Sequence, residues 1–381
     1  MQRGRFVQTA VFYSFIYMAN AGILSYLSLF YAEMNISEAN IGLLSALNAL
    51  LATLAGPFWG VCGDRSGVKN RVLQLCLLMS ALTVWLLPLA GGQIGPLIAA
   101  VCVFFFFHSA IYPMSDAISL ELASRERFSF SAVRTIGSIG FMIMSVVIGA
   151  LIEYDVNYIF GASSLFILLA LAALAVMPRV GGARTGKLTI RFWAVLHNRA
   201  LARMYLYVLI LSVGFGFFIS FHALYSVERG ISTGLLGIGI MLGSVSQLPF
   251  MVFFEKLYRR FGIRRIIAVS GLFNVVRWIG YAYWLNPYTV LPLWLLHGAT
   301  FIVLYLCLAE YVHRHVQKEL KVSGQMMNSI VLQGAGRVLG GVLGGFSVAL
   351  FDYSAVFAVS GAVTLLAVLL FWVTTRATDE R

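Results

Sequence analysis

Long apolar runs alternate with short polar segments along the whole chain. A helix needs about 20 residues to cross roughly 30 Å of hydrocarbon, and windows of this length fit twelve apolar runs. The pattern therefore predicts an all-α polytopic membrane protein with twelve transmembrane helices. The predicted spans are 7–31, 40–62, 72–91, 96–120, 132–152, 158–177, 202–225, 234–254, 266–285, 289–310, 326–350 and 354–375.

The longest polar stretch divides these spans into two sets of six, and the two sets resemble each other. GDRSGVKNR follows the second span and RRFGIRR follows the eighth. GSIGFMIMSVVIGALIEYDVNYIFG in the fifth and sixth spans corresponds to GAGRVLGGVLGGFSVALFDYSAVFA in the last two. The repeat predicts two pseudo-symmetric halves, an N-terminal bundle at 1–178 and a C-terminal bundle at 201–381, joined by a cytoplasmic central loop at 179–200.

Composition and charge placement agree with a membrane location. Hydrophobic residues make up 60% of the chain and charged residues 11%, and the mean hydropathy is +0.88, which no soluble domain of this size shows. With the N-terminus in the cytoplasm, 23 of the 27 Lys and Arg residues fall on the cytoplasmic side and only Arg229 falls outside. This asymmetry follows the positive-inside rule. It predicts a multi-pass plasma-membrane protein with both termini cytoplasmic, and it explains the net charge of +12 without nucleic-acid binding.

No motif indicates a metal, a cofactor or a cleaved signal. The four cysteines all lie within apolar runs and have no paired spacing, so we expect packing residues without disulfides or metal. No GxxxxGK[ST] phosphate-binding loop is present. The segment MQRGRF leads directly into the first span and predicts an uncleaved helix.

A carboxylate and a guanidinium inside the apolar runs are the most informative residues. Asp116 lies in the fourth span and Arg134 in the fifth. A charge at membrane depth costs at least about 2.5–3.5 kcal/mol on insertion scales, so it is tolerated when it is paired or faces water. The two spans run in opposite directions, so the two residues can meet at one depth. They would either contact a cargo or form a static ion pair that stabilises the first half.

Two more arginines, Arg277 and Arg337, lie in the ninth and eleventh spans. Arginine keeps its proton in proteins, so each needs an anion or water. Positive charge within the spans exceeds negative charge, because Glu310 lies at a cytoplasmic end. This surplus favours an anionic cargo such as a carboxylate, which an arginine binds through its planar fork. Asn20 either lines the cargo site or hydrogen-bonds across helices.

The loop after the second span carries a recognisable motif. Gly60, Asp64, Arg65 and Gly67 form the pattern GxxxDRxGxK, which resembles the cytoplasmic loop motif of the major facilitator superfamily. That resemblance implies the major facilitator fold, with cargo bound near mid-membrane between the halves, and a loop that helps latch them. The alternative is an ordinary solvated turn. The acid of the motif is missing from the second half.

A closer resemblance covers nearly the whole chain. Asp116 followed 18 residues later by Arg134 resembles the lactose-permease group of oligosaccharide–proton symporters. Arg277-Trp278, the segment 296–301 and Gly324-Gln325 resemble the sister group typified by the phenylpropionate permease. The resemblance implies that Asp116 and Arg134 contact substrate, while Arg277 and His297 belong to a coupling network. A lone buried histidine is otherwise a core residue, which is our expectation for His108 and His222.

Two departures from this pattern concern proton coupling. The lactose-permease group carries an acid three residues after the histidine of the tenth helix, where this chain has Thr300. The phenylpropionate-type group carries an acid on the eighth helix, where this chain has Gln247. Both positions are neutral here, so an uncoupled facilitator or exporter remains an alternative to a symporter.

The sequence as a whole predicts a secondary active transporter that moves a small organic solute across the plasma membrane by alternating access. Proton-coupled symport of an organic, aromatic acid is the leading hypothesis, with Asp116, His297 and Glu310 as proton-coupling candidates. The expected partners are the solute, protons and the bilayer, and the expected state is a monomer. The predicted substrate-binding residues are Asp116, Arg134, Arg277, His297, Arg337, Gln247 and Asn20.

Other functions remain as alternatives. A sugar or a nucleoside is an alternative cargo. An intramembrane lipid-modifying enzyme is a distant alternative, because no HxxxD- or HExxH-like cluster is present. A sensor without flux would be expected to carry an additional soluble domain. Tryptophans near the predicted outer interface, among them Trp294, are expected to anchor there.

Overall fold

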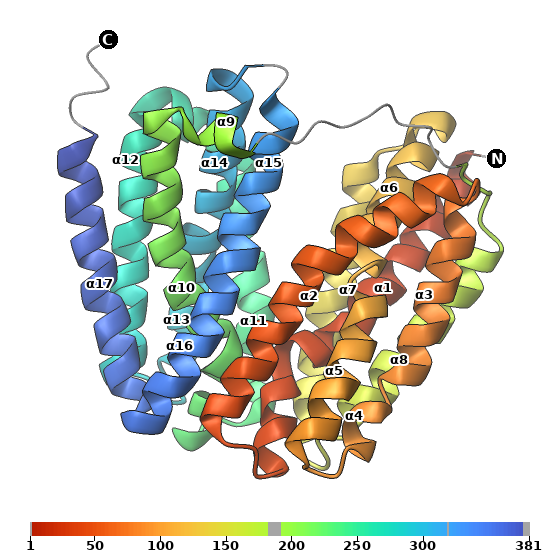
Figure 1. The fold of residues 1–381 in the computed structure, drawn as a ribbon, viewed down its shortest axis with the longest axis horizontal. Coiled ribbons are helices and arrows are strands. Elements are labelled where there is room, and N and C mark those ends of the chain that lie inside the picture. The colour runs from red at the N-terminus through yellow and green to blue at the C-terminus, as the bar shows by residue number, and fades with distance from the viewer. Residues whose placement is uncertain (1, 182–191, 318–319, 376–381) are drawn as a thin grey trace. The chain divides into compact units, whose positions relative to one another are not determined.

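The predicted spans are present as helices in the computed structural model, which describes residues 2–181, 192–317 and 320–375 (Figure 1). Eleven helical stretches in these ranges are long and apolar enough to cross a membrane. One of them, Thr233–Tyr283, has 51 residues and contains two predicted spans. Within it, Gly262 has φ 70° and ψ 158°, which interrupts α12 (Gln247–Tyr283). The all-α fold with its twelve apolar crossings is therefore confirmed.

The chain clusters into two compact units. Unit 1 comprises Met1–Ile36, Leu47–Lys187 and Ser232–Met241. Unit 2 comprises Ser37–Ala46, Leu188–Ile231 and Leu242–Arg381.

The central helix of unit 1 is α1 (Gln2–Glu33), which packs against α6 (Ile111–Glu126), α7 (Phe130–Ile152) and α8 (Tyr158–Ala175). α3 forms a second layer with α5, α6 and α8. The elements of unit 1 are α1 (Gln2–Glu33), most of α2 (Glu38–Arg65), α3 (Lys69–Thr83), α4 (Leu86–Leu89), α5 (Ile94–His108), α6 (Ile111–Glu126), α7 (Phe130–Ile152), α8 (Tyr158–Ala175) and most of α11 (Thr233–Val245).

Prolines explain why two predicted spans of unit 1 appear as two helices each. Pro88 and Pro113 lack the N–H that would bond the carbonyl four residues earlier, and each helix break lies three to four residues before the proline, at residues 84–85 and 109–110. The break before Pro113 separates α5 from α6. Pro113 itself lies three residues, about one helical turn, before Asp116 in the same predicted span.

Glycines on α7 allow α1 to approach closely beside that site. A Cβ atom added at Gly137 would lie 2.8 Å from Cδ1 of Tyr13, and one at Gly140 would lie 3.3 Å from Cγ of Met18. Such distances leave no room for a larger residue at Gly137 unless Tyr13 moves. The glycines of the FSAVRTIGSIGF segment therefore help to place Tyr13.

Unit 2 is centred on α10 (Arg199–Glu228), which packs against α16, α17 and a π-helical segment. The other elements of unit 2 are α9 (Phe192–Leu196), α12, α13 (Val290–Leu295), η1 (Gly298–Ile302), α14 (Val303–His315), α15 (Lys321–Ser329), η3 (Ile330–Ala335), α16 (Gly336–Leu350) and α17 (Tyr353–Thr374). Both π-helical segments of the described chain lie in this unit, and such segments occur frequently at functional sites.

The glycine spacing in the eleventh span produces a close helix pair. A Cβ atom at Gly340 would overlap the carbonyl oxygen of Val213, and one at Gly336 would overlap the side chain of Ser212. The small residues of α16 thus face α10, as expected for glycines four residues apart in membrane helices.

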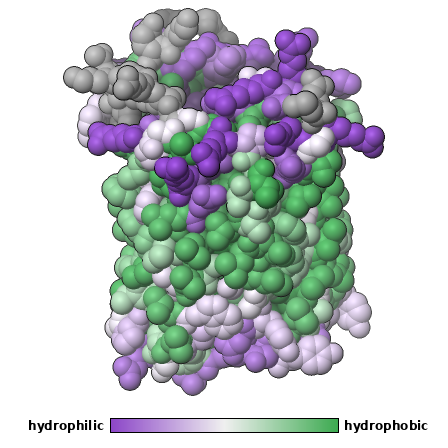
Figure 2. Space-filling model, turned by 90° about the vertical axis from the view of Figure 1, so that its right-hand side faces the viewer, coloured by the Kyte–Doolittle hydropathy of each residue, from purple (hydrophilic) through white to green (hydrophobic). Residues whose placement is uncertain are grey.

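The outer surface matches a bilayer. Figure 2 shows a broad apolar band between two polar edges on the face that it displays. Leu54, Leu82 and Leu366 are among many large apolar side chains that are more than half exposed. Soluble proteins rarely expose continuous apolar surface on this scale, so a surface of this kind suits a lipid environment.

Candidate functional site

The loop motif of unit 1 forms a short ion-paired turn. The carboxylate of Asp64 lies 3.0 Å from the ammonium of Lys69, across the turn between α2 and α3. Gly67 has φ +74°, a left-handed conformation that favours glycine. A Cβ atom at Gly60 would meet nothing within 4 Å, so close packing does not explain that glycine. Arg65 ends α2 beside the turn.

Asp116 is held by a tyrosine of the first helix. The hydroxyl of Tyr13 on α1 donates a hydrogen bond to Oδ1 of Asp116 on α6. Tyr13 is fully buried, whereas Asp116 is half-buried. The Tyr13 ring stacks on Tyr17 at 5.3 Å between centroids, and Tyr17 meets Tyr112 edge-to-face at 5.1 Å. The carboxylate therefore lies at one end of a row of three tyrosines.

Arg134 lies near the same carboxylate. Its side chain projects from α7 and is exposed, and its charge acts on both Asp116 and Tyr112. A guanidinium exposed at membrane depth requires water or a polar partner rather than acyl chains. The structure thus brings the predicted pair, Asp116 and Arg134, within electrostatic range of each other in unit 1.

Two other polar residues of unit 1 lie in its interior. Asn20 is fully buried and donates to the carbonyl of Ile16 at 2.8 Å, while its Oδ1 has no partner among the described residues. His108 is buried against Phe104, 4.9 Å between centroids, and its Nε2 likewise has no described partner. Among the described residues, no hydrogen bond joins Asn20 or His108 to Asp116.

Arg277 is the centre of a buried cluster in unit 2. Its side chain is 0% exposed. Nη1 donates to Nδ1 of His297 at 3.2 Å and to Oγ1 of Thr300 at 3.4 Å. Thr300 belongs to η1 and His297 immediately precedes it. The π-helical segment and the residue before it therefore present the two acceptors to the arginine of α12.

Aromatic rings surround the Arg277 guanidinium. Its Cζ lies 4.2 Å from the ring centroid of Phe218 and 5.2 Å from that of Trp278. Trp294 and Tyr281 follow at 5.7 Å and 5.9 Å. A desolvated cation–π contact contributes about 2 kcal/mol or more. These contacts offset part of the cost of burying the charge.

The partner atoms fix the protonation pattern of His297. Every nitrogen of an arginine side chain donates and none accepts, so Nδ1 of His297 must supply a lone pair. The ring is therefore neutral, with its proton on Nε2. A second proton on Nδ1 would face the guanidinium directly and break this hydrogen bond.

Both arginines in the spans of unit 2 lack an acidic partner. Within the described ranges, no carboxylate lies within 4 Å of Arg277 or Arg337, and Nε and Nη2 of Arg277 are buried without a hydrogen-bond partner. Arg337 is half-buried on α16, and its backbone packs against Gly216. Gln247, where an acid was expected, begins α12 half-buried beside Gly298. The fixed charge of this unit within the membrane is positive.

Glu310 belongs to a different group of charges. It pairs with Arg314, whose Nη2 also lies 3.2 Å from Oε2 of Glu255. Glu255 in turn accepts from Nε of Arg259 at 2.8 Å. These side chains are partly or largely exposed, so the group is a surface ion-pair network rather than part of the Arg277 cluster.

Several residues of these clusters were not predicted. Trp294 was expected to anchor at the outer interface, which is wrong, because it is 4% exposed and packs beside Arg277. Tyr13 and Phe218 carried no sequence signal, since aromatic residues are common in every span. His222, expected in the core, is buried against Phe218 at 4.8 Å. Among the described residues, no three His, Cys, Asp or Glu side chains gather to hold a metal.

Helices that span a bilayer, with ionisable side chains at membrane depth in each of two units, define a polytopic solute transporter. A family model described as the MFS_1 like family matches residues 6–359, and the chain belongs to this family within the major facilitator superfamily. Its relatives are transporters rather than enzymes, which excludes the lipid-modifying alternative.

Two curated relatives and one solved structure illustrate the similarity. The chain is 26% identical to the maltose permease of Geobacillus stearothermophilus, over 94% of this chain and 92% of the permease. It is 28% identical to the probable 3-phenylpropionic acid transporter of Escherichia coli K12, over 72% and 73% of the two chains. The crystal structure of the nucleoside transporter NupG matches with a TM-score of 0.87 and 16% identity, over 97% of this chain and 99% of that one. This last match shows the fold alone.

Proposed function

We propose that this transporter is a proton-coupled symporter of a small organic acid. It would act as a monomer in the plasma membrane, with both termini in the cytoplasm, which the distribution of basic residues between the loops supports. The similarity to a probable 3-phenylpropionic acid transporter makes an aromatic carboxylate the leading cargo.

The charge balance within the spans is the observation that carries the proposal. Asp116 has Arg134 within electrostatic range, but Arg277 and Arg337 have no acidic partner among the described residues. Buried donors that lack acceptors are costly, especially on a charged group. An anionic cargo supplies the missing acceptor and the missing charge at once.

The roles divide between the two units. In unit 1, Asp116 carries the proton and Arg134 contacts the cargo carboxylate. In unit 2, Arg277 supplies the N–H groups of Nε and Nη2 to the cargo when the cluster opens, and Arg337 adds positive charge. Asn20 and Gln247 offer hydrogen bonds to the cargo, and Gly60, Asp64, Arg65 and Gly67 act in the loop that latches the halves.

Of the three proton-carrying candidates, Asp116 is favoured by its surroundings. His297 uses Nδ1 to accept from Arg277, so a second proton is opposed by an adjacent cation. Glu310 is paired with Arg314 in the surface network. Asp116 is half-buried and accepts a hydrogen bond from the neutral phenol of Tyr13, so it can change charge outside the surface ion-pair network that holds Glu310.

A neutral cargo is the second candidate. The row formed by Tyr13, Tyr17 and Tyr112 ends at a carboxylate, an arrangement that could stack a sugar or nucleobase ring while Asp116 accepts its hydroxyl hydrogens. The similarity to a maltose permease over 94% of this chain favours a sugar. Because Gln247 and Thr300 are neutral, an uncoupled facilitator or exporter would suit either kind of cargo.

A solute screen in proteoliposomes tests the proposal. Radiolabelled 3-phenylpropionate, maltose and uridine are offered with and without an inward proton gradient. We expect the carboxylate to accumulate when the outside is acidic and the other two to remain at background. Gradient-independent uptake of the carboxylate would contradict proton coupling, and accumulation of maltose or uridine instead would contradict the anionic cargo.

Two matched variants test whether carboxylate uptake depends on Arg134. Arg134→Ala should abolish carboxylate uptake, whereas Arg125→Ala, which removes an exposed arginine at the end of α6, should not. Equal uptake by Arg134→Ala and the wild type would exclude Arg134 as a cargo contact.

A further inference from the structure

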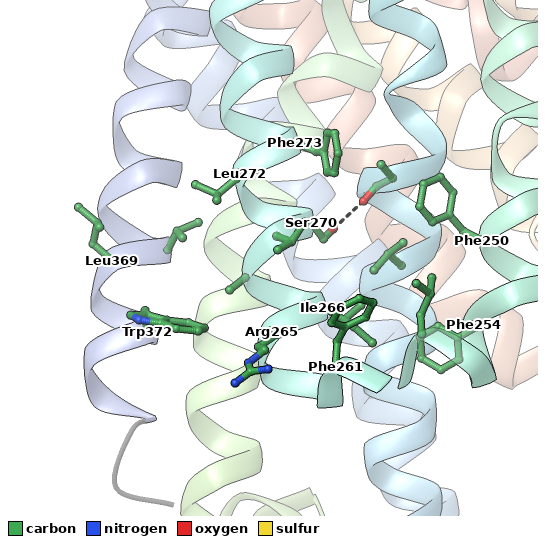
Figure 3. Close-up of a pocket in the computed structure, with 16 residues that line it drawn as sticks. Phe250, Phe254, Phe261, Arg265, Ile266, Ser270, Leu272, Phe273, Leu369 and Trp372 are labelled. Carbon is green, nitrogen blue, oxygen red and sulfur yellow. Dashed lines mark hydrogen bonds between the residues drawn. The ribbon is translucent and has the colours of Figure 1, made fainter. Parts of the chain in front are cut away.

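An apolar groove lies on unit 2, apart from the Arg277 cluster. It has a volume of about 670 Å³. Its walls come from both arms of α12, from η1 and α14, and from α17. The lining is aromatic and aliphatic, with Phe250 and Phe254 on one side and Leu369 and Trp372 on the other (Figure 3). All of these residues belong to unit 2.

Ser270 and Arg265 are the two polar residues in the lining. The hydroxyl of Ser270 is occupied, because it donates to the carbonyls of Ala299 and Thr300 at 2.9 Å and 3.1 Å. Arg265 is exposed and has no hydrogen bond or ion pair with any described residue. Figure 3 shows it at the end of the groove nearer the end of α17, on the same side as Trp372. The groove therefore has an apolar body with one free cation at its end.

The neighbouring basic residues are already engaged. Arg264 donates to Oγ1 of Thr375 at 2.9 Å and to the carbonyl of Trp372 at 2.6 Å. Arg259 pairs with Glu255. Arg260 is exposed, but its guanidinium lies over the ring of Phe261 at 5.3 Å and it does not line the groove. Arg265 is thus placed to bind an external anion at the groove.

We propose that this groove binds a membrane phospholipid with an anionic head group, one acyl chain lying in the groove and the phosphate on Arg265. An acyl chain alone cannot make the site selective, because lipid tails are as apolar as leucine side chains. Selectivity must come from the head group, where a planar guanidinium matches phosphate oxygens. A basic segment at the cytoplasmic leaflet also attracts anionic lipids in general.

The site would also support the buried cluster. Ala299 lines the groove, and the adjoining Thr300 accepts from Arg277. Ser270 ties both backbone carbonyls to α12. A lipid acyl chain packed against Ala299 would support η1 from the groove side, without touching His297 or Arg277.

Native mass spectrometry of the full chain tests the site without relying on transport. The protein is offered equal amounts of phosphatidylglycerol and phosphatidylcholine, and lipid retention is measured for wild type, Arg265→Gln, Arg260→Gln and Val269→Trp. Val269 lines the groove and is 49% exposed, so a tryptophan there fills the groove from outside the core. Size-exclusion elution checks that each variant is folded.

The wild type should retain phosphatidylglycerol in preference to phosphatidylcholine. Arg265→Gln should weaken phosphatidylglycerol retention about fivefold, the contribution of one basic residue at an anionic membrane surface. Arg260→Gln should resemble the wild type, and Val269→Trp should lower retention of both lipids. Equal losses in Arg265→Gln and Arg260→Gln, or full retention by Val269→Trp, would overturn the proposal. So would displacement of the lipid by glycerol phosphate alone, because that result would mean that the groove contributes nothing.

Discussion

The Asp116 site of unit 1 and the Arg277 cluster of unit 2 place ionisable groups at membrane depth in two different ways. Asp116 is half-buried, accepts from a tyrosine and has an exposed arginine within electrostatic range. Arg277 is fully buried among rings and neutral acceptors, with no carboxylate near it in the described chain. Unit 1 therefore holds a half-buried acid with a cation in range, whereas unit 2 holds a buried cation without an acidic partner among the described residues.

The contrast between the Asp116 site and the Arg277 cluster also bears on whether His297 carries a proton. In unit 2, His297 lies beside a permanent cation, which opposes a second proton on the ring. Its contribution is to hold one Nη1 hydrogen and leave Nε and Nη2 of Arg277 available. We therefore propose that unit 1 exchanges the proton and unit 2 binds the anion, and the following substitutions test that division.

Substitution of Arg277 should have the largest effect. Arg277→Gln removes the cation but keeps a donor for His297, and we expect carboxylate transport to fall about 100-fold, as when one partner of a buried charge pair is lost. Arg277→Lys should not restore it, because an ammonium cannot donate to His297 and present a planar fork to the cargo at once. Initial uptake rates in proteoliposomes measure both variants.

The control for Arg277 is Arg229→Lys, which also alters an arginine over an aromatic ring but outside the cluster. It should transport normally. Activity within threefold of wild type in Arg277→Gln would mean that the buried cation serves folding alone.

Loss of the acid should have the next largest effect. Asp116→Asn keeps an acceptor for Tyr13 but cannot release a proton. Accumulation driven by one pH unit should fall from roughly tenfold to none, since a tenfold ratio corresponds to the 1.4 kcal/mol in that gradient. Exchange of labelled for unlabelled solute should continue.

Glu121→Gln is the matched control, because it removes a carboxylate from the same helix, where it pairs with Arg125. If Asp116→Asn and Glu121→Gln accumulate solute equally, then the acid of unit 1 is not the carrier.

The tyrosine beside Asp116 should have a smaller effect. Tyr13→Phe removes the hydrogen bond that orients the carboxylate but keeps the ring stack on Tyr17. Hydrogen bonds to charged groups contribute about 1.5–3 kcal/mol, and part of this should appear as an approximately fivefold lower rate of driven uptake. Tyr17→Phe keeps the same stack and should lie within twofold of wild type. If Tyr13→Phe and Tyr17→Phe take up solute at the same rate, then the Tyr13 hydroxyl has no role in transport.

The smallest effect is expected at the histidine. His297→Gln offers an amide oxygen to Arg277 in place of the ring nitrogen, so driven uptake should change less than threefold. A complete loss of gradient-driven accumulation in His297→Gln, with exchange retained, would make His297 the proton carrier and reverse the division between the units.

The fold was predictable because bilayer physics leaves few choices. Runs of about 20 apolar residues must be helical, and the repeat of GDRSGVKNR in RRFGIRR located two turns that both contain a glycine in the left-handed region, Gly67 and Gly262. The positions of Asp116 and Arg277 were also evident, since charges at membrane depth stand out in an apolar sequence.

The partners of those charges were not predictable. Tyr13 bonds to Asp116 although the two residues are 103 positions apart in the sequence. A tyrosine within an apolar span has no pattern that distinguishes it from other tyrosines. Trp294 was assigned to an interface by residue type, although its neighbours place it beside Arg277. The π-helical segment that presents Thr300 depends on tertiary packing against α12, which periodicity does not report.

Proton movement in step with solute is the most direct test of the account. Proteoliposomes containing a pH-sensitive dye receive 3-phenylpropionate from outside, and the change in internal pH is compared with that of protein-free vesicles, which report diffusion of the neutral acid. We predict faster internal acidification with the wild type than with empty vesicles, and none beyond the empty vesicles with Asp116→Asn. Solute entry through the wild type without additional acidification would contradict proton-coupled transport through the acid of unit 1.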